Sequence, residues 1–486
     1  MNEKLNDALN EISDQHIAEA AKPRRRRQIH WIGAAAAVLV VAILAGALYP
    51  LPVGPDTPNF SSPVGTNSHQ FSNLVATPDY PQINPHPQLG NFQTYESYFT
   101  AHEAWRKTQA EQYDQPEGYA DSLAAFFRQS ISQFLSGEGN RAYSPVNVYL
   151  AMAMLAESAA GSSRQQILDL LGAGSIEGLR EQAGHVWNAH YANDGLTTLL
   201  LANSLWLDDA YHFHKDTVDT LADSYYASVF HGDLGTDSTN QQLRDWLNAN
   251  TGNLLTEQTK ETELSAETVA ALASTIYFSA PWDQKFSEKA TVSQVFHSPE
   301  GDMRTDFMKN TYLDYPYYWG ENFGAIRLEL SGNNRMWLIL PDEGKTPQDL
   351  LSSEAFLTMA QAPGNWEQKA NYQVNLSLPK FDISSQEDLV EGMKALGITD
   401  VFSPDVANLS SLVEGGGVYV GNVDHAVRVT VDEEGCTAAA YTVIEAPSSG
   451  MPQEREEVDF TLDRPFLFLV TSRDNLPLFA GVVANP

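Results

Sequence analysis

The sequence predicts an α+β fold, because helical and strand patterns of different periods both occur after residue 113. Residues Asp121–Phe134 place their large apolar side chains on one helical face, with Asp121 as the expected cap. Pro145 opens a second helix that is apolar all round and should therefore be buried. Strand patterns occur at Leu200–Leu207 and Leu272–Phe278, and they return at the C-terminus.

Composition limits the classes of function. The chain has 486 residues, an apolar fraction of 43% and a formal charge of −33. An apolar fraction of this size can form a globular core, whereas the strong negative charge argues against nucleic-acid binding. Cys436 is the only cysteine, which excludes an intrachain disulfide and a cysteine-based metal cluster. His212 and His214 have no third ligand candidate nearby, so no metal and no cofactor is expected.

The N-terminal part predicts a membrane anchor. Residues 1–30 are polar and read as a cytoplasmic tail, and Arg24–Arg27 immediately precede an uncharged run at 31–49. At about 1.5 Å per residue that run is roughly 28 Å long, close to the thickness of a bilayer core. Its flanking arginines place the N-terminus in the cytoplasm. The alternative is a secretory signal peptide cleaved after Ala45–Ala47.

The remaining chain divides into two parts. Residues 50–112 are rich in Pro, Asn and Ser and predict an extended linker, and residues 113–486 form the globular domain. With an anchor at 31–49, this domain would lie outside the cytoplasm, as a single-pass protein of the cell membrane. A bacterial cell surface fits the anchor and the scarcity of cysteine.

The segment Val431–Val443 has two faces of different size. With a period of two, one face carries only small side chains, those of Cys436, Ala438, Ala440 and Thr442. Such a strand can enter a packed sheet without clashes, whereas its charged start and its proline-containing end suit an exposed loop. Periodicity alone favours an ordinary strand that ends in a loop, because short alternating runs are common.

A family resemblance adds to this interpretation. The segment Glu433–Ala440 resembles the hinge of the serpin reactive-centre loop, and about a dozen weaker motifs follow the family order from residue 115 to 486. The resemblance implies a serpin fold with a large central, mainly antiparallel sheet, smaller sheets, about nine helices and an exposed reactive-centre loop. The implied hinge residues are Glu433, Glu434, Gly435, Cys436, Thr437, Ala438, Ala439 and Ala440.

The same resemblance implies a buried polar cluster behind the sheet and an aromatic residue above it. Family members pair a histidine with two serines on a buried helix and an asparagine on a strand. Here His425 matches the histidine, but Ser144 and Asn147 occupy the helix and Ser274 the strand, so one Ser and the Asn have exchanged places. We predict that these four side chains keep a hydrogen-bond network, because buried polar groups need partners. Trp282 matches the tryptophan at the top of the sheet.

The implied function is inhibition of serine proteases by suicide-substrate trapping, with a covalent complex between protease and inhibitor. The usual distance from the hinge points to Ser449–Gly450 as the reactive bond, with Arg455–Glu456 as second choice. Ser449 suggests elastase-like or subtilisin-like targets. The alternative is a non-inhibitory serpin that acts as a surface binding or scaffold protein. No nucleophile motif supports an enzyme, and a monomer is expected.

Overall fold

The protein is described by a computed structural model that covers residues 71, 73–81, 83–415, 417–421, 423–436 and 456–486. The predicted tail and anchor at 1–49 lie outside these residues, as does the first part of the predicted linker. Among the described residues, no helix is long and apolar enough to cross a membrane. The short 3-10 turn η1 (Leu89–Asn91) belongs to a separate compact unit.

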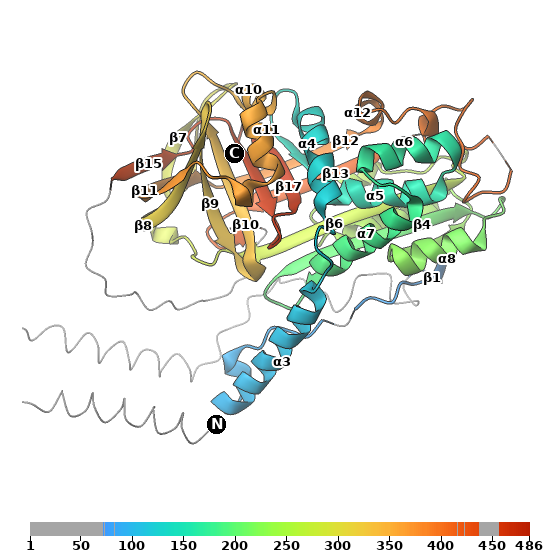
Figure 1. The fold of residues 1–486 in the computed structure, drawn as a ribbon, viewed down its shortest axis with the longest axis horizontal. Coiled ribbons are helices and arrows are strands. Elements are labelled where there is room, and N and C mark those ends of the chain that lie inside the picture. The colour runs from blue at the N-terminus through green and yellow to red at the C-terminus, as the bar shows by residue number, and fades with distance from the viewer. Residues whose placement is uncertain (1–70, 72, 82, 416, 422, 437–455) are drawn as a thin grey trace, which may run out of the picture. The chain divides into compact units, whose positions relative to one another are not determined.

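The central sheet consists of long strands that lie mostly antiparallel to one another (Figure 1). The parallel pair β4–β5 is an exception. A two-residue strand, β14, lies between the long strands β6 and β13. In spatial order the strands are β1 (Leu74–Ala76), β5 (Ala227–Gly232), β4 (Thr198–Asp208), β6 (Ala270–Pro281), β14 (Gly435–Cys436), β13 (Asp424–Val431) and β12 (Phe381–Asp388), and β3 (Ala192–Asn193) pairs with β4.

The second sheet ends at β15, the strand that follows the reactive-centre segment in sequence. Its core-facing side chains are apolar and buried, as alternation along each strand requires. In spatial order its strands are β15 (Glu457–Thr461), β11 (Lys369–Pro379), β8 (Gly301–Gly320), β9 (Phe323–Leu330), β10 (Asn334–Pro341), β16 (Phe466–Thr471), β17 (Pro477–Val483) and β2 (Arg141–Tyr143), and β7 (Val292–Ser298) pairs with β8.

Helices cover both faces of the central sheet. The helix α5 is almost entirely buried and packs on β6. The helices α4, α6, α7 and α8 lie around it (Figure 1). On the opposite face, Leu243 and Trp246 of α9 pack with Trp206 and Phe230 of the sheet. The described residues form ten α-helices: α3 (Tyr95–Tyr113), α4 (Asp121–Leu135), α5 (Pro145–Ser158), α6 (Gly161–Leu171), α7 (Ile176–His190), α8 (Lys215–Ser224), α9 (Asp237–Asn250), α10 (Pro347–Leu351), α11 (Glu354–Gln361) and α12 (Val390–Ala395).

Two local expectations need correction. Residues 50–112 were expected to be an extended linker, but their described part contains β1 and nearly all of α3. Part of this segment packs on the sheet, because Phe71 is buried against Phe230 and β1 pairs with the edge strand β5. Asp121 does not cap α4; it occupies the first helical position, and the cap residue Ala120 offers no side-chain hydrogen bond.

Candidate functional site

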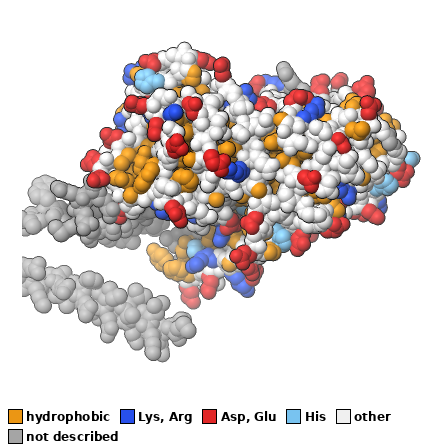
Figure 2. Space-filling model, turned by 45° about the horizontal axis from the view of Figure 1, so that its top comes forward, with side chains coloured by type: hydrophobic (Ala, Val, Ile, Leu, Met, Phe, Trp, Pro, Cys, Tyr) orange, Lys and Arg blue, Asp and Glu red, His pale blue; other side chains and the backbone are white. Residues whose placement is uncertain are grey.

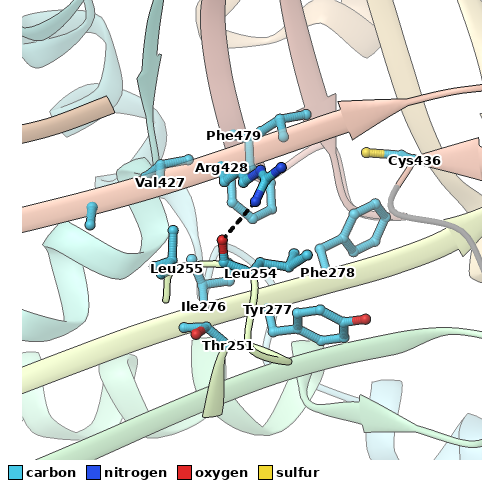
Figure 3. A pocket seen from close by; sticks show the side chains of 12 residues that line it. Thr251, Leu254, Leu255, Ile276, Tyr277, Phe278, Val427, Arg428, Cys436 and Phe479 are labelled. Atoms are coloured by element: carbon cyan, nitrogen blue, oxygen red, sulfur yellow. Dashed lines mark hydrogen bonds between the residues drawn. The ribbon is translucent and has the colours of Figure 1, made fainter. Parts of the chain in front are cut away.

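The candidate site is a groove in the central sheet between β6 and β13. At its upper end β14 bridges the two strands, with Cys436 opposite Ala280 of β6 and Val431 of β13. Beyond Cys436, no described strand joins β6 to β13. Apolar side chains from both strands line the groove, and Phe479 of the second sheet lies behind it (Figure 3).

Gly435 is required where β14 enters the sheet. A Cβ atom at this position would lie 2.4 Å from the carbonyl oxygen of Ala280 and 2.7 Å from the Cα of Pro281. Real Cβ atoms do not approach backbone so closely, so only glycine allows β14 to pair with β6 here. Cys436 follows with 2% of its surface exposed and faces the groove, as expected for the small-residue face of this segment.

A charged and hydrogen-bonded anchor holds the chain just before β14. The carboxylate of Glu433 accepts a hydrogen bond from the Thr291 hydroxyl over 2.7 Å and pairs with Lys380 over 2.9 Å. Burial raises the pKa of Glu433, but the hydrogen bonds from Lys380 and Thr291 outweigh it, so the net pKa lies below the ordinary value. The pKa of Lys380 is raised, chiefly by its hydrogen bond with Glu433. Glu434 pairs with Lys285.

Trp282 ties the same turn to the end of β6. Its indole N–H donates to the carbonyl of Asp432 over 2.8 Å, and its backbone N–H donates to the carbonyl of Glu434 over 3.0 Å. The ring packs edge-on against Phe286 at 5.9 Å between centroids. Five of the predicted site residues, Trp282 and Glu433 to Cys436, therefore lie together at this end of the groove.

The four residues expected to form a buried polar network are connected in space. The backbone N–H of Ser144 donates to Nε2 of His425 over 3.2 Å, and its hydroxyl accepts from the N–H of Asn147. Asn147 in turn accepts a hydrogen bond from the Ser274 hydroxyl at 2.5 Å and donates to the Ser274 carbonyl at 3.3 Å. Complete burial lowers the pKa of His425 to about 4, so the ring is neutral near pH 7. The exchange of Ser and Asn thus preserves a contact between α5 and β6.

A loop covers part of the groove on the side of α9. Thr251, Leu254 and Leu255, just after this helix, line the groove (Figure 3). The guanidinium of Arg428 on β13 donates to the Leu254 carbonyl over 3.0 Å and makes two hydrogen bonds to Asp382 on β12, at 2.8 and 2.6 Å. The loop is therefore fastened to β13, one border of the groove, and through Arg428 also to β12.

The other predicted site residues lie outside the described part of the chain. These are the hinge residues Thr437 to Ala440, both residues of the bond Ser449–Gly450, and Arg455. Glu456 is described: it is exposed, and its carbonyl accepts a hydrogen bond from the Gln373 N–H just before β15. His214 makes a backbone hydrogen bond to Leu412, and no described group of three or more His, Cys, Asp or Glu could hold a metal ion.

Sequence reasoning missed three residues of the site. Lys380 and Thr291 hold Glu433, and Arg428 holds the covering loop. Lys380 and Thr291 lie in the part of the chain that the family resemblance covers, but nothing in the sequence indicated that they both contact a glutamate far along the chain. Arg428 carried no signal beyond a charge on an alternating strand.

Carboxylates are spread over the whole face seen in Figure 2, with Lys and Arg between them. This distribution agrees with a soluble, self-repelling surface rather than with one acidic binding patch.

Comparison with known proteins identifies the family. The model of the family described as Serpin (serine protease inhibitor) matches residues 122–486. Serpin-ZX of Arabidopsis thaliana is 28% identical over 372 residues, which cover 72% of this chain and 93% of the relative. Alpha-1-antiproteinase 2 of Equus caballus is 28% identical over 399 residues, 80% of this chain and 91% of the relative. The expected bacterial source finds no support in these two relatives, a plant and a mammalian protein.

Solved structures agree with this assignment. The native state of tengpin, a thermophilic serpin, superimposes with a TM-score of 0.68 at 26% identity and covers 77% of this chain and 95% of tengpin. The native stressed conformation of Arabidopsis AtSerpin1 gives a TM-score of 0.66 at 25% identity, with coverage of 78% and 98%. The predicted α+β serpin fold is thus confirmed, with ten described helices where about nine were expected. Because the family model spans well over half of its length, the chain belongs to the serpin family of serine protease inhibitors.

Proposed function

We propose that this protein inhibits a serine protease by trapping it as a covalent complex, with insertion of the reactive-centre segment into the groove between β6 and β13. The observation that carries the proposal is the position of β14 between β6 and β13. Its two residues already pair with both bordering strands, and the groove continues beyond Cys436 along the path that the following residues would take.

Strand direction supports this path. β14 is antiparallel to both β6 and β13, so its continuation would add an antiparallel strand between two parallel neighbours. Each added residue would satisfy backbone groups of both borders, and the small side chains of Ala438 and Ala440 would meet the groove as Cys436 does. Strand insertion would therefore lower the free energy through hydrogen bonds and burial, without steric conflict.

The chemical step would follow that of an ordinary protease substrate. The hydroxyl of the protease serine attacks the carbonyl carbon of Ser449, the bond to Gly450 breaks, and the new amino group of Gly450 leaves with the proton. The resulting ester joins the protease to Ser449. Insertion then carries the attached protease away before water can hydrolyse the ester. Ser449 favours elastase-like or subtilisin-like targets, and cleavage at Arg455 would instead indicate trypsin-like ones.

The decisive experiment mixes the protein with elastase, subtilisin or trypsin and looks for a complex that survives SDS. We expect a covalent band with elastase or subtilisin, and sequencing of the released peptide should begin at Gly450. Loop cleavage without a covalent band would reject trapping and favour the alternative of a non-inhibitory surface binding protein.

A pair of substitutions tests insertion itself. Ala440→Arg places a long cation on the face that would enter the sheet, whereas the matched control Ala439→Arg places it on the outer face. We expect the first variant to be cleaved as a substrate and the second to keep forming the complex. Equal trapping by both variants would contradict insertion in this register.

We also propose that residues 31–49 anchor the protein in a membrane, with the serpin domain on the extracytoplasmic side. The uncharged run and the four arginines before it support this location. Fractionation of cells that express the full chain should place it in the membrane fraction, released only by detergent. Deletion of residues 31–49 should move it to the soluble fraction; a full chain that is soluble and begins after residue 47 would support the cleaved signal peptide instead.

A further inference from the structure

We propose that the outer face of the second sheet holds a binding site for a small tetrahedral oxyanion such as sulfate or phosphate. The site is an open groove across β8, β11 and β15, on the side of the sheet that faces away from the core. Its central residues are Lys309, Ser377 and Thr461, one from each strand.

The strand register places these three residues side by side. Lys309 is the partner of Ser377 in the β8–β11 pair, and Ser377 is the partner of Thr461 in the β11–β15 pair. Residues paired in this way project from the same face of a sheet. The neighbouring positions Leu376 and Phe460 are buried on the core side, which fixes the outward direction of Ser377 and Thr461.

Ser377 supplies the observation that points to a ligand. Only 6% of its surface is exposed, it lines the groove, and its hydroxyl oxygen has no hydrogen-bond partner among the described residues. A buried hydroxyl without a partner costs free energy, and protein interiors rarely contain one. A ligand in the groove would provide the missing partner.

The two residues beside Ser377, Lys309 and Thr461, favour an anion as the ligand. Lys309 is exposed and makes no ion pair with any described residue, although the chain carries 62 acidic against 29 basic side chains. The Thr461 hydroxyl likewise has no hydrogen-bond partner within the described part. Neighbouring strands lie about 4.8 Å apart, so one tetrahedral anion can accept hydrogen bonds from both hydroxyls while the longer lysine side chain reaches it. All three groups can donate a hydrogen bond, as an oxyanion requires.

The carboxylate of Asp459 limits the affinity for an anion but does not block the site. Asp459 also lines the groove, one row further along β15, and there its carboxylate accepts a hydrogen bond from Asn375 over 2.9 Å. Residues two positions apart on a strand are separated by about 7 Å, so this charge weakens anion binding rather than occupying the site. One exposed lysine and two hydroxyls in an open groove predict a dissociation constant on the order of 1 mM.

The position of the groove gives the anion a structural effect. β15 begins at Glu457, after the reactive-centre segment, and among the described strands it pairs with β11 alone, at the edge of the sheet. An anion bound to Lys309, Ser377 and Thr461 would connect β15 to β11 and β8. The groove also includes Ala290, whose neighbour Thr291 holds the Glu433 carboxylate before the hinge. This site would therefore lie between the anchor of the hinge, at Glu433, and the strand β15 that follows the reactive-centre segment. Anion binding and protection of β15 are independent of protease inhibition, because both are measured without a protease.

Equilibrium dialysis of the full chain against radiolabelled sulfate, at ionic strength held constant with NaCl, tests the site directly. We expect one saturable site, competition by inorganic phosphate, and at least tenfold weaker binding in Lys309→Gln. Ser377→Ala should weaken binding about threefold without loss of stability, since it removes an unpartnered buried hydroxyl. Lys345→Gln, a change at an exposed lysine outside the groove, is the matched control and should bind sulfate normally.

Hydrogen exchange provides the second measurement. Saturating sulfate should slow amide exchange in residues 457–461 of the unaltered chain but not in Lys309→Gln. Absence of a saturable site, failure of phosphate to compete, or equal binding by Lys309→Gln and Lys345→Gln would each overturn the proposal.

Discussion

The backbone N–H of Ser144 donates a hydrogen bond to Nε2 of His425, which joins the start of the buried helix α5 to β13, one border of the groove. An Nε2 that accepts a hydrogen bond carries no proton, so this contact exists only with a neutral ring. Burial of the ring enforces the same state by lowering its pKa to about 4. The groove border and the helix behind it are thus linked through a group that titrates.

Acid should weaken this link mainly at pH values above the ordinary carboxylate pKa values of about 4. The folded pKa of about 4 lies below the ordinary histidine value of about 6.5, so the unfolded chain binds the proton first as pH falls. The contribution of His425 to stability is therefore complete above about pH 6.5 and is lost between about 6.5 and 4, by up to about 3 kcal/mol. We expect the urea midpoint to fall across this range. His425→Asn, which cannot titrate, should show a smaller fall over the same range; an identical pH profile would contradict the assignment.

Asn147 and Ser274 should contribute to stability as a pair. Asn147→Ala leaves the Ser274 hydroxyl without its acceptor in a partly buried place, and the expected loss is about 1–3 kcal/mol of unfolding free energy. In a double-mutant cycle with Ser274→Ala, the two losses should be less than additive. The measurement is the urea midpoint of each variant, and an unchanged midpoint in Asn147→Ala would show that the network carries no free energy.

The pair Lys380–Glu433 should hold the hinge against premature entry into the sheet. Lys380→Ala leaves a nearly buried carboxylate with one partner fewer, and we expect a loss of about 1–2 kcal/mol together with faster loss of the native state at 37 °C. The folded pKa of Glu433 is lowered, so this contribution is present above the ordinary glutamate pKa of about 4.3 and disappears as pH falls through the lower folded value. Lys215→Ala, at an exposed pair with Asp219, is the control and should leave stability nearly unchanged, because solvent screens an exposed ion pair.

Arg428 should slow strand insertion by holding the covering loop. Arg428→Ala removes the hydrogen bond to Leu254 and both bonds to Asp382. The loop after α9 then loses its fastening to β13, and we expect trapping of a protease to become faster, by roughly 2- to 10-fold for a contact worth about 0.5–1.5 kcal/mol. Stopped-flow measurement of complex formation tests this. Asp382→Asn keeps the Leu254 bond and is the comparison variant; an Arg428→Ala rate at or below the rate of the unaltered chain would contradict the role.

The sequence alone identified most of the elements and much of the candidate site. Alternation with small residues marked the segment from Cys436 onward, a proline opened α5, and the order of weak motifs indicated the family before any contact was known. These signals are local: each depends on residues within one helix or strand, so the chain reveals them without folding. Composition failed for residues 71–112, where a linker was expected, because a few aromatic residues suffice to dock a polar segment onto a sheet edge.

Only the tertiary structure brought Lys380 and Thr291 to Glu433, Arg428 to Leu254, and Lys309 to Ser377 and Thr461. Each of these contacts joins residues from elements far apart in the chain, and strand register decides which residues meet. Register is set by packing of the whole sheet against its helices, so no single stretch of sequence encodes it. The sequence therefore marked the segment around Cys436 as a strand with one small face, and the fold decided which side chains hold that segment beside β6 and β13.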